Sequence, residues 1–87
     1  MSGGWEAHAG AVAAAIERVG ELQEALAMAT DRAESAIGMT LESTGSTEVD
    51  SARNALDFLS GAKERVEEAY RMSQQATAEL QRYRGGF

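Results

Sequence analysis

His8 is the only histidine of the chain, and histidine is the side chain most often used for acid–base chemistry. A histidine acts as a general base when a nucleophile lies beside it, and it binds metal when further ligands follow at helical spacing. No nucleophile partner and no Glu-x-x-His pair accompanies His8 in the sequence. We therefore interpret it as a side chain near the end of a helix, close to Trp5, and not as a catalytic base or a metal ligand.

Acidic residues are the second candidates, because carboxylate oxygens bind divalent cations. Two groups have suitable spacing: Glu17, Glu21 and Glu24, and Glu64, Glu67 and Glu68. Residues three or four apart share one face of a helix, where solvated carboxylates are common. Glycine pairs occur only at Gly3-Gly4 and Gly85-Gly86, so no phosphate-binding loop is present. We expect no catalytic residue, no metal, no cofactor and no small-molecule substrate, and hence a protein that is not an enzyme.

The overall charge narrows the classes of partner. The chain carries a net charge of −6, and most of it belongs to residues 1–46, which hold seven acids and two bases. Nucleic acids and anionic lipids bind basic surfaces, so we expect neither as a partner. No apolar run reaches the roughly 20 residues of a membrane helix. The absence of cysteine excludes disulfides.

Helical periodicity dominates the first half of the chain. A seven-residue series runs through Trp5, Val12, Val19, Leu26 and Ala33, and its companions are Ala9, Ala15, Ile16, Leu22, Ala29, Ala36 and Ile37. This spacing predicts one long amphipathic helix. Three glycines interrupt the pattern: Gly10, Gly20 and Gly38. We expect them to mark a close approach of helices or local softness.

A second seven-residue series, Ala52, Leu59, Val66, Ser73 and Leu80, predicts another long helix. A ladder of small residues lies beside it: Ala55, Ala62, Ala69 and Ala76. We expect the ladder to face the first helix at close range, so that Ala69→Leu would overpack the contact and lower the melting temperature. Lys63, Glu67 and Arg71 are spaced four apart and should form weak surface pairs.

The polar segment 42–47 separates the two helices. We predict an all-α fold with a single domain over residues 1–87: a helix over 4–42, a turn over 43–46 and a helix over 47–84. Gly45 suits the end of a helix and Thr47 the cap of the next. The result is an antiparallel two-helix hairpin about 55–60 Å long. Its alanine-rich core is small, so we expect a homo-oligomer, with pairing into a four-helix bundle, or a larger helical assembly.

The large side chains allow two interpretations. Trp5 and Tyr83 either staple the open end of the hairpin or dock a partner. Met28, Met39 and Met72 either fill the core, which we favour, or form an adaptable surface. The predicted interface consists of Trp5, Phe58, Leu59, Val66, Tyr70, Met72 and Tyr83.

Part of the chain resembles small helical-hairpin segments of Streptomyces-like bacteria, which occur alone or at the N-terminus of polymorphic toxins. The stretch that carries this resemblance runs from Leu41-Glu42-Ser43-Thr44-Gly45-Ser46 through Val66-Glu67-Glu68-Ala69 to Ala78-Glu79-Leu80-Gln81-Arg82-Tyr83. The plan is also similar to the acidic helical hairpins of type VII secretion in actinobacteria and firmicutes. Their Trp-x-Gly turn is replaced here by Ser43-Thr44-Gly45, and Gln74 and Phe87 stand where an acid would follow Tyr70 and Tyr83.

These observations lead to two hypotheses of different class. The first is a non-enzymatic helical interaction module, serving as a secretion or targeting accessory or an adaptor of an exported toxin system, as the resemblance implies. The second is a structural subunit of a larger assembly, such as a phage particle or an injection apparatus. The first residues lack a basic n-region, so we expect a cytoplasmic protein or one exported without a cleaved Sec signal peptide.

Overall fold

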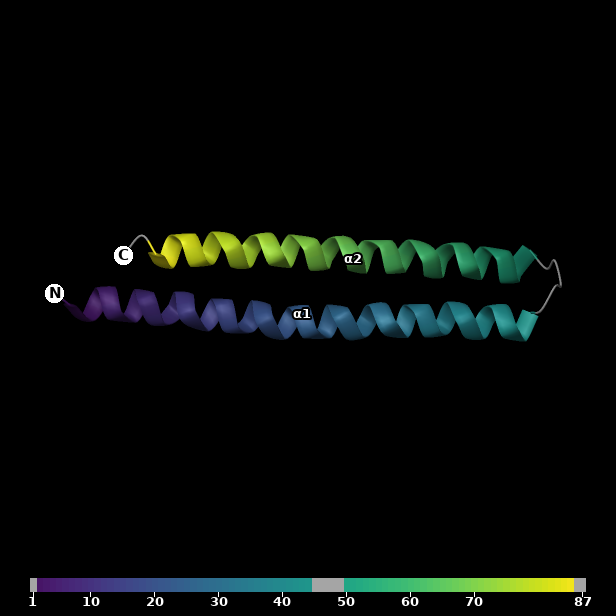
Figure 1. Ribbon diagram of the computed structural model, residues 1–87, viewed down its shortest axis with the longest axis horizontal. Helices are drawn as coiled ribbons and strands as arrows, with labels where there is room; N and C mark the ends of the chain where they lie inside the picture. Colours follow the sequence, from purple (N-terminus) through teal and green to yellow (C-terminus); the bar gives the residue numbers. More distant parts are fainter. Residues whose placement is uncertain (1, 45–49, 86–87) are drawn as a thin grey trace.

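The chain forms two long helices that fold back on each other. The computed structural model describes the backbone of residues 2–44 and 50–85 and the side chains of residues 7–43 and 50–85. Helix α1 spans Ser2–Thr44 and helix α2 spans Asp50–Gly85, and they lie side by side and antiparallel (Figure 1). The described residues contain no strand. The predicted all-α hairpin is therefore confirmed.

Both helices extend beyond their predicted outer ends, and the segment that connects them lies later in the sequence than predicted. Helix α1 begins two residues before the expected residue 4 and runs two residues beyond 42, through Ser43 and Thr44, which were expected in the turn. Helix α2 begins at Asp50 rather than at 47. In the last turns of α1, hydroxyl groups bond to carbonyls of their own helix: Thr40 Oγ1 donates to the carbonyl of Ala36 at 2.7 Å and Ser43 Oγ to that of Thr40 at 3.1 Å. The expected Gly45 end and Thr47 cap lie outside the described residues.

The molecule is a rod. Its extents are 69 × 14 × 14 Å, longer than the expected 55–60 Å because α1 alone has 43 residues. Neither helix, over the described residues, has a stretch that is long and apolar enough to cross a lipid bilayer.

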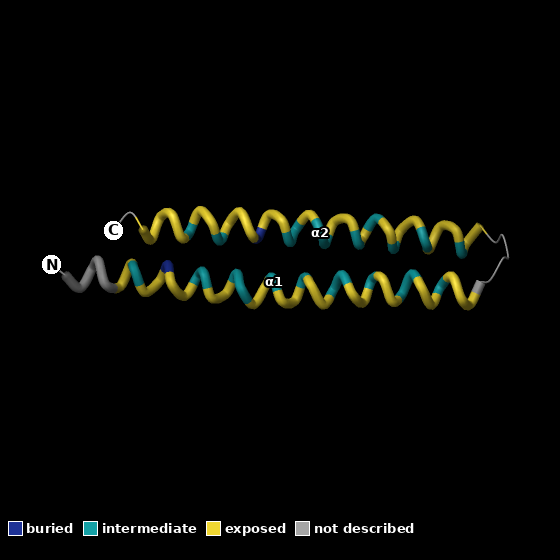
Figure 2. Tube along the Cα trace, viewed as in Figure 1, coloured by how far each residue is buried: buried dark blue, intermediate teal, exposed yellow. Residues whose placement is uncertain are grey.

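One regular line of contact holds the two helices together, and we call it the hairpin seam. Its residues alternate at spacings of three and four, and all are buried or half-buried (Figure 2). On α1 they are Ala9, Val12, Ile16, Val19, Gln23, Leu26, Thr30, Ala33, Ile37 and Thr40. On α2 they are Ala52, Leu56, Leu59, Lys63, Val66, Tyr70, Ser73, Thr77 and Leu80. This spacing is the a/d repeat of a coiled coil.

The alanine ladder is not part of the seam. Ala55, Ala62 and Ala76 are exposed and Ala69 is half-buried, so the expected close contact with α1 is wrong. Leu56 follows Ala55 by one residue and has more apolar area to bury, so it takes the position that faces α1. An added side chain at Ala69 would extend along the flank. The expected overpacking of Ala69→Leu against α1 thus loses its structural basis.

The glycines do not serve close packing either. A Cβ atom built at Gly10, Gly20 or Gly38 would meet no atom within 4 Å, and the same holds for Gly61. The expectation that the first three mark a close approach of helices is therefore wrong.

The core of the hairpin is thin. Among the described side chains only Val12, 7% exposed, is a buried hydrophobic residue, and Ser73, 5% exposed, is a buried polar one. No described side chain is fully enclosed. Two helices present only one stripe to each other, so each seam residue keeps part of its surface in contact with solvent.

Candidate interaction surface

Polar side chains fix how the two helices are aligned along the seam. Gln23 Nε2 of α1 donates to Thr77 Oγ1 of α2 at 3.3 Å. Ser73 Oγ instead donates to the carbonyl of Tyr70 in its own helix at 2.6 Å. A slip of one helix along the other would leave Gln23 and Thr77 half-buried without this bond. The pair therefore favours one register over its neighbours.

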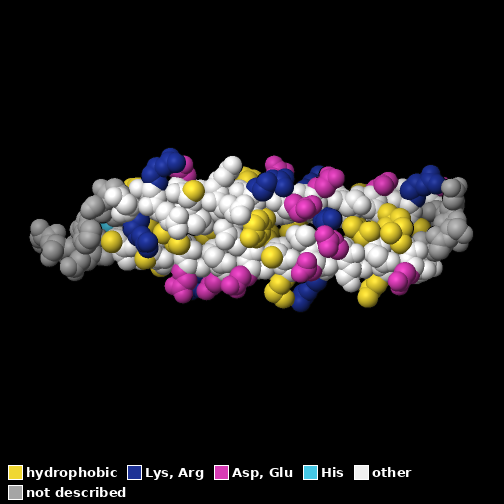
Figure 3. All heavy atoms as spheres, viewed as in Figure 1, with side chains coloured by type: hydrophobic (Ala, Val, Ile, Leu, Met, Phe, Trp, Pro, Cys, Tyr) yellow, Lys and Arg dark blue, Asp and Glu magenta, His cyan; other side chains and the backbone are white. Residues whose placement is uncertain are grey.

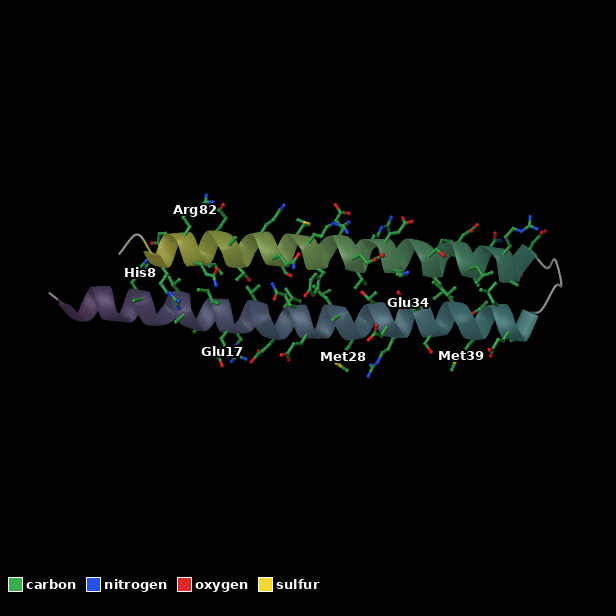
Figure 4. All side chains as sticks on the ribbon, viewed as in Figure 1. His8, Glu17, Met28, Glu34, Met39 and Arg82 are labelled. Carbon is green, nitrogen blue, oxygen red and sulfur yellow. The ribbon has the colours of Figure 1, made fainter. Side chains whose placement is uncertain are left out.

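An ion pair crosses the hairpin nearer the turn. Lys63 Nζ lies 3.2 Å from Glu34 Oε1, and Figure 4 shows Glu34 directed toward α2. The hydrogen bond to Glu34 and the charge of Glu34, together with a smaller contribution from Glu67, raise the pKa of Lys63 although desolvation lowers it. Lys63 was expected to pair with Glu67 on the surface of its own helix. It occupies a seam position, however, and its long side chain reaches the carboxylate of the other helix.

An aromatic contact lies near the open end. The rings of His8 and Tyr83 meet edge to face, with centroids 5.3 Å apart and planes at 72°, and His8 Nε2 is hydrogen-bonded to the Tyr83 hydroxyl. Tyr83 thus staples the two helices, as one of the two interpretations held. Its partner is His8, and the side chain of Trp5 lies outside the described residues.

The two flanks of the seam differ in composition. The spacing of the seam puts Ile16 and Gln23 of α1 and Leu56 and Lys63 of α2 among the a positions of the heptad. In an antiparallel pair, residues just before the a positions of both helices lie on the same flank. The His8–Tyr83 contact joins two such residues. We call this flank the alanine face and define it by Ala15, Leu22, Ala29 and Ala36 of α1 with Ala55, Ala62, Ala69 and Ala76 of α2. It runs along most of the rod without a polar side chain.

The outer rim of the alanine face, one helical position further from the seam, adds large apolar groups. Its residues are Ala11, Arg18, Ala25, Arg32 and Met39 on α1 and Phe58, Arg65, Met72 and Glu79 on α2. Phe58 is 80% exposed, and Met39 and Met72 are also exposed. Within the described residues, Glu79 is the only carboxylate of the face and its rim, and Arg82 pairs with it at 3.0 Å.

The acidic side chains lie on the remaining surface. They are Glu17, Glu21, Glu24, Asp31, Glu34 and Glu42 on α1 and Asp50, Asp57, Glu64, Glu67 and Glu68 on α2. Figure 3 shows a face of the rod on which acidic side chains occur along both helices. The net charge of −6 is therefore distributed unevenly around the rod. The acidic side chains lie away from the alanine face, on the surface that also carries the exposed Met28 and Leu41.

The residues of the predicted interface separate into two groups. Leu59, Val66 and Tyr70 are half-buried and belong to the hairpin seam, so they hold the hairpin itself together. Phe58 and Met72 are exposed on the rim of the alanine face, and Tyr83 is exposed near its end. Trp5 cannot be assigned to either group, because its side chain lies outside the described residues.

The methionines do not fill the core. Met28, Met39 and Met72 are each more than half exposed, and Figure 4 shows Met28 and Met39 directed away from α2. The favoured interpretation as core fillers is therefore wrong. A two-helix contact has room for one stripe only, and the residues of the hairpin seam already occupy it.

The acidic flank has a shallow groove but no group of metal ligands. The groove has a volume of about 330 Å³ and is lined by Ala27, Thr30, Asp31, Glu67, Tyr70 and Arg71. Among the described residues, no three His, Asp or Glu side chains are placed to hold a metal ion.

Sequence reasoning missed Gln23 and Thr77 as seam residues because a polar residue breaks the apolar pattern. The available signal was their seven-residue spacing from Ile16 and Tyr70.

Comparison with protein-family models, curated proteins and solved structures finds no match to the chain.

Proposed function

We propose that the protein is a non-enzymatic interaction module that binds a helical protein partner through the alanine face and its rim. The observation that carries this proposal is the exposure of Phe58, Met39 and Met72 beside an apolar strip. Exposed large apolar groups that gather on one side of a protein mark an interaction site, whereas single scattered ones do not.

The shape of the face suits a helix. Most of its side chains are alanines, and small side chains let another helix come close. Residues such as Phe58 and Met72 can then act as anchors, because aromatic residues and methionine are enriched at protein interfaces. The acidic surface elsewhere keeps the rod hydrated and directs association to this one side.

Photo-crosslinking tests the proposal in cells that produce the protein. A photoreactive phenylalanine analogue placed at Phe58 should form covalent protein adducts upon irradiation. The same group at Glu24, on the acidic surface, serves as the matched control and should form few. Equal adduct formation from both positions, or none from Phe58, would contradict an interaction through the alanine face.

The role in an exported toxin system that the sequence resemblance implies stays a prediction. Adducts identified by mass spectrometry as toxin or secretion components would support it. Adducts composed of particle subunits would support the structural alternative.

A further inference from the structure

We infer that the alanine face is covered by a second copy of this chain, giving a four-helix bundle in which both turns lie at the same end. This inference rests on the proposed function and names the partner of the same face. Three observations carry it: the amount of exposed surface, the distribution of charge and the match between rim residues.

The exposed area is sufficient for a dimer. The hairpin exposes 6455 Å². A folded monomer of 9.2 kDa is expected to expose about 4,900 Å², so the hairpin exposes roughly 1,500 Å² more. A stable interface needs about 800 Å² from each partner. Two rods in contact along one side can supply this area, and each would enclose the open side of the other's thin core.

Charge selects the side on which two copies meet. The acidic surface of one chain would repel that of another, since eleven carboxylates of the described residues lie there. The alanine face carries no charge, and its rim carries Arg18, Arg32, Arg65 and Glu79. Contact through the alanine face therefore leaves the acids of both copies pointing outward.

The rim decides how the second copy is oriented. The Glu34–Lys63 pair marks one level of the rod. Counting equal numbers of residues along both helices from this level, Met39 lies level with Phe58, Ala25 with Met72 and Arg18 with Glu79. A two-fold axis along the rod places α1 over α2 of the second copy. Met39 then meets Phe58, and the small Ala25 meets the large Met72.

The opposite orientation, with a two-fold axis across the rod, places each helix over its own copy. With this axis at the level of Met72, near the middle of the rod, Met72 meets Met72 and Ala25 meets Ala25, which crowds one position and leaves a gap at the other. Rim charges favour neither orientation. With the axis along the rod, Arg18 meets Glu79 and Arg32 meets Arg65. With the axis across the rod, Arg65 meets Glu79 and Arg18 meets Arg32, so each orientation has one attractive and one repulsive type of pair. The apolar rim therefore favours the arrangement with both turns at the same end.

Sedimentation equilibrium of the purified chain tests self-association. The wild type should have twice the mass of the 9.2 kDa chain at micromolar concentration. Ala62→Glu places a carboxylate in the alanine face and should weaken the dimer roughly 100-fold or more. Ala78→Glu, an exposed alanine of the same helix away from this face, is the control and should leave the dimer unchanged. Circular dichroism should give the same helical signal for both variants and the wild type.

A monomeric wild type would overturn the inference, and so would equal behaviour of the two variants. The proposed function would still stand if a monomeric chain formed crosslinks from Phe58 to a different protein. Loss of crosslinks from Phe58 altogether would instead overturn both.

Introduced cysteines test the orientation, because the chain has no cysteine of its own. Met39→Cys combined with Phe58→Cys should give a disulfide-linked dimer after mild oxidation, whereas Met72→Cys alone should not. The reverse result, a linked dimer from Met72→Cys alone, would overturn the arrangement with both turns at the same end.

Discussion

At the scale of single residues, polar groups in the hairpin seam determine register more than stability. Glu34 and Lys63 form an ion pair that is only partly shielded from water, and such pairs contribute little to stability. Gln23 and Thr77 form a weak, long hydrogen bond. Both pairs act mainly through the free energy that is lost when one helix slips along the other and separates the partners. A uniformly apolar seam would be indifferent to a shift by one heptad.

The Glu34–Lys63 pair should make stability depend on alkaline pH. The pKa of Lys63 is raised in the folded chain above its unfolded value of about 10.4. Its contribution is therefore complete below that pH and is lost as the pH rises through the folded value. The difference in melting temperature between wild type and Lys63→Gln should stay constant from neutral pH to about 10 and change above it. Glu34→Gln should give the same profile; a profile that changes near neutral pH would contradict this assignment.

Ser73 should be replaceable by alanine but not by leucine. Its hydroxyl bonds only to a carbonyl of its own helix, and alanine has a helix propensity about 0.5 kcal/mol better. Ser73→Ala should therefore raise the free energy of unfolding slightly. Ser73→Leu should lower it by about 1–3 kcal/mol, because the position is closed by α1. Urea denaturation of both variants measures the difference. A stabilising leucine would show that the seam has unfilled space at this point.

At the scale of the elements, sequence reasoning found both helices and nearly two thirds of the seam. Val12, Leu26 and Leu59 were identified because large apolar residues at seven-residue spacing have only one plausible environment. The ladder at Ala55 to Ala76 was misplaced, since alanine fits a seam, a flank or an exposed face equally well. Gln23, Lys63 and Thr77 were missed because a pattern of hydropathy cannot distinguish a paired polar residue from a solvated one.

Substituting the helix glycines should stabilise the elements. A Cβ at Gly10, Gly20, Gly38 or Gly61 meets no atom within 4 Å, and alanine is favoured over glycine in a helix interior by about 1 kcal/mol. The four sites are distant from one another, so their effects should add. A variant with all four replaced should gain about 2–4 kcal/mol in free energy of unfolding. Chemical denaturation measures the gain, and a destabilised variant would indicate a contact at one of these positions in the assembled protein.

Phe58 and Leu59 are neighbours with different roles. Leu59 is half-buried in the hairpin seam, and Leu59→Ala should lower the free energy of unfolding by about 2 kcal/mol or more. Phe58 is exposed, so Phe58→Ala should change the stability of an isolated hairpin little but weaken association. Thermal melts and sedimentation of the two variants separate these effects. Equal loss of stability at low protein concentration would show that Phe58 also supports the hairpin.

At the scale of the whole molecule, the antiparallel hairpin followed directly from two periodic segments and one polar break. What could not be predicted is which flank stays apolar. That property depends on the angular offset between the charged residues and the seam, and the seam itself was defined only when Gln23, Lys63 and Thr77 were placed in it. Once the seam is known, the acidic surface and the alanine face follow from the helical geometry.

If two copies share the alanine face, the melting temperature must depend on protein concentration. A dimer that dissociates on unfolding is stabilised by mass action, so the transition should move to higher temperature as the chain is concentrated from micromolar to hundreds of micromolar. Ala62→Glu should melt at a temperature independent of concentration, and Ala78→Glu should behave like the wild type. Scanning calorimetry over this range provides the measurement. A wild-type transition that does not move would contradict coupled folding and association.

The spacing of the cross-helix contacts along the chain also determines the order in which the rod can assemble. Gln23 and Thr77 are separated by 54 residues in sequence, and His8 and Tyr83 by 75, so each contact further from the turn closes a longer loop. Once the segments next to the turn have paired, however, every later contact closes only a few additional residues, and the entropy of loop closure is spread over many small steps. We therefore expect the two helices to pair first next to the turn and then progressively toward the chain ends. Although its cross-helix contacts join residues far apart in sequence, we expect the hairpin to fold at the rate of a chain with local contacts.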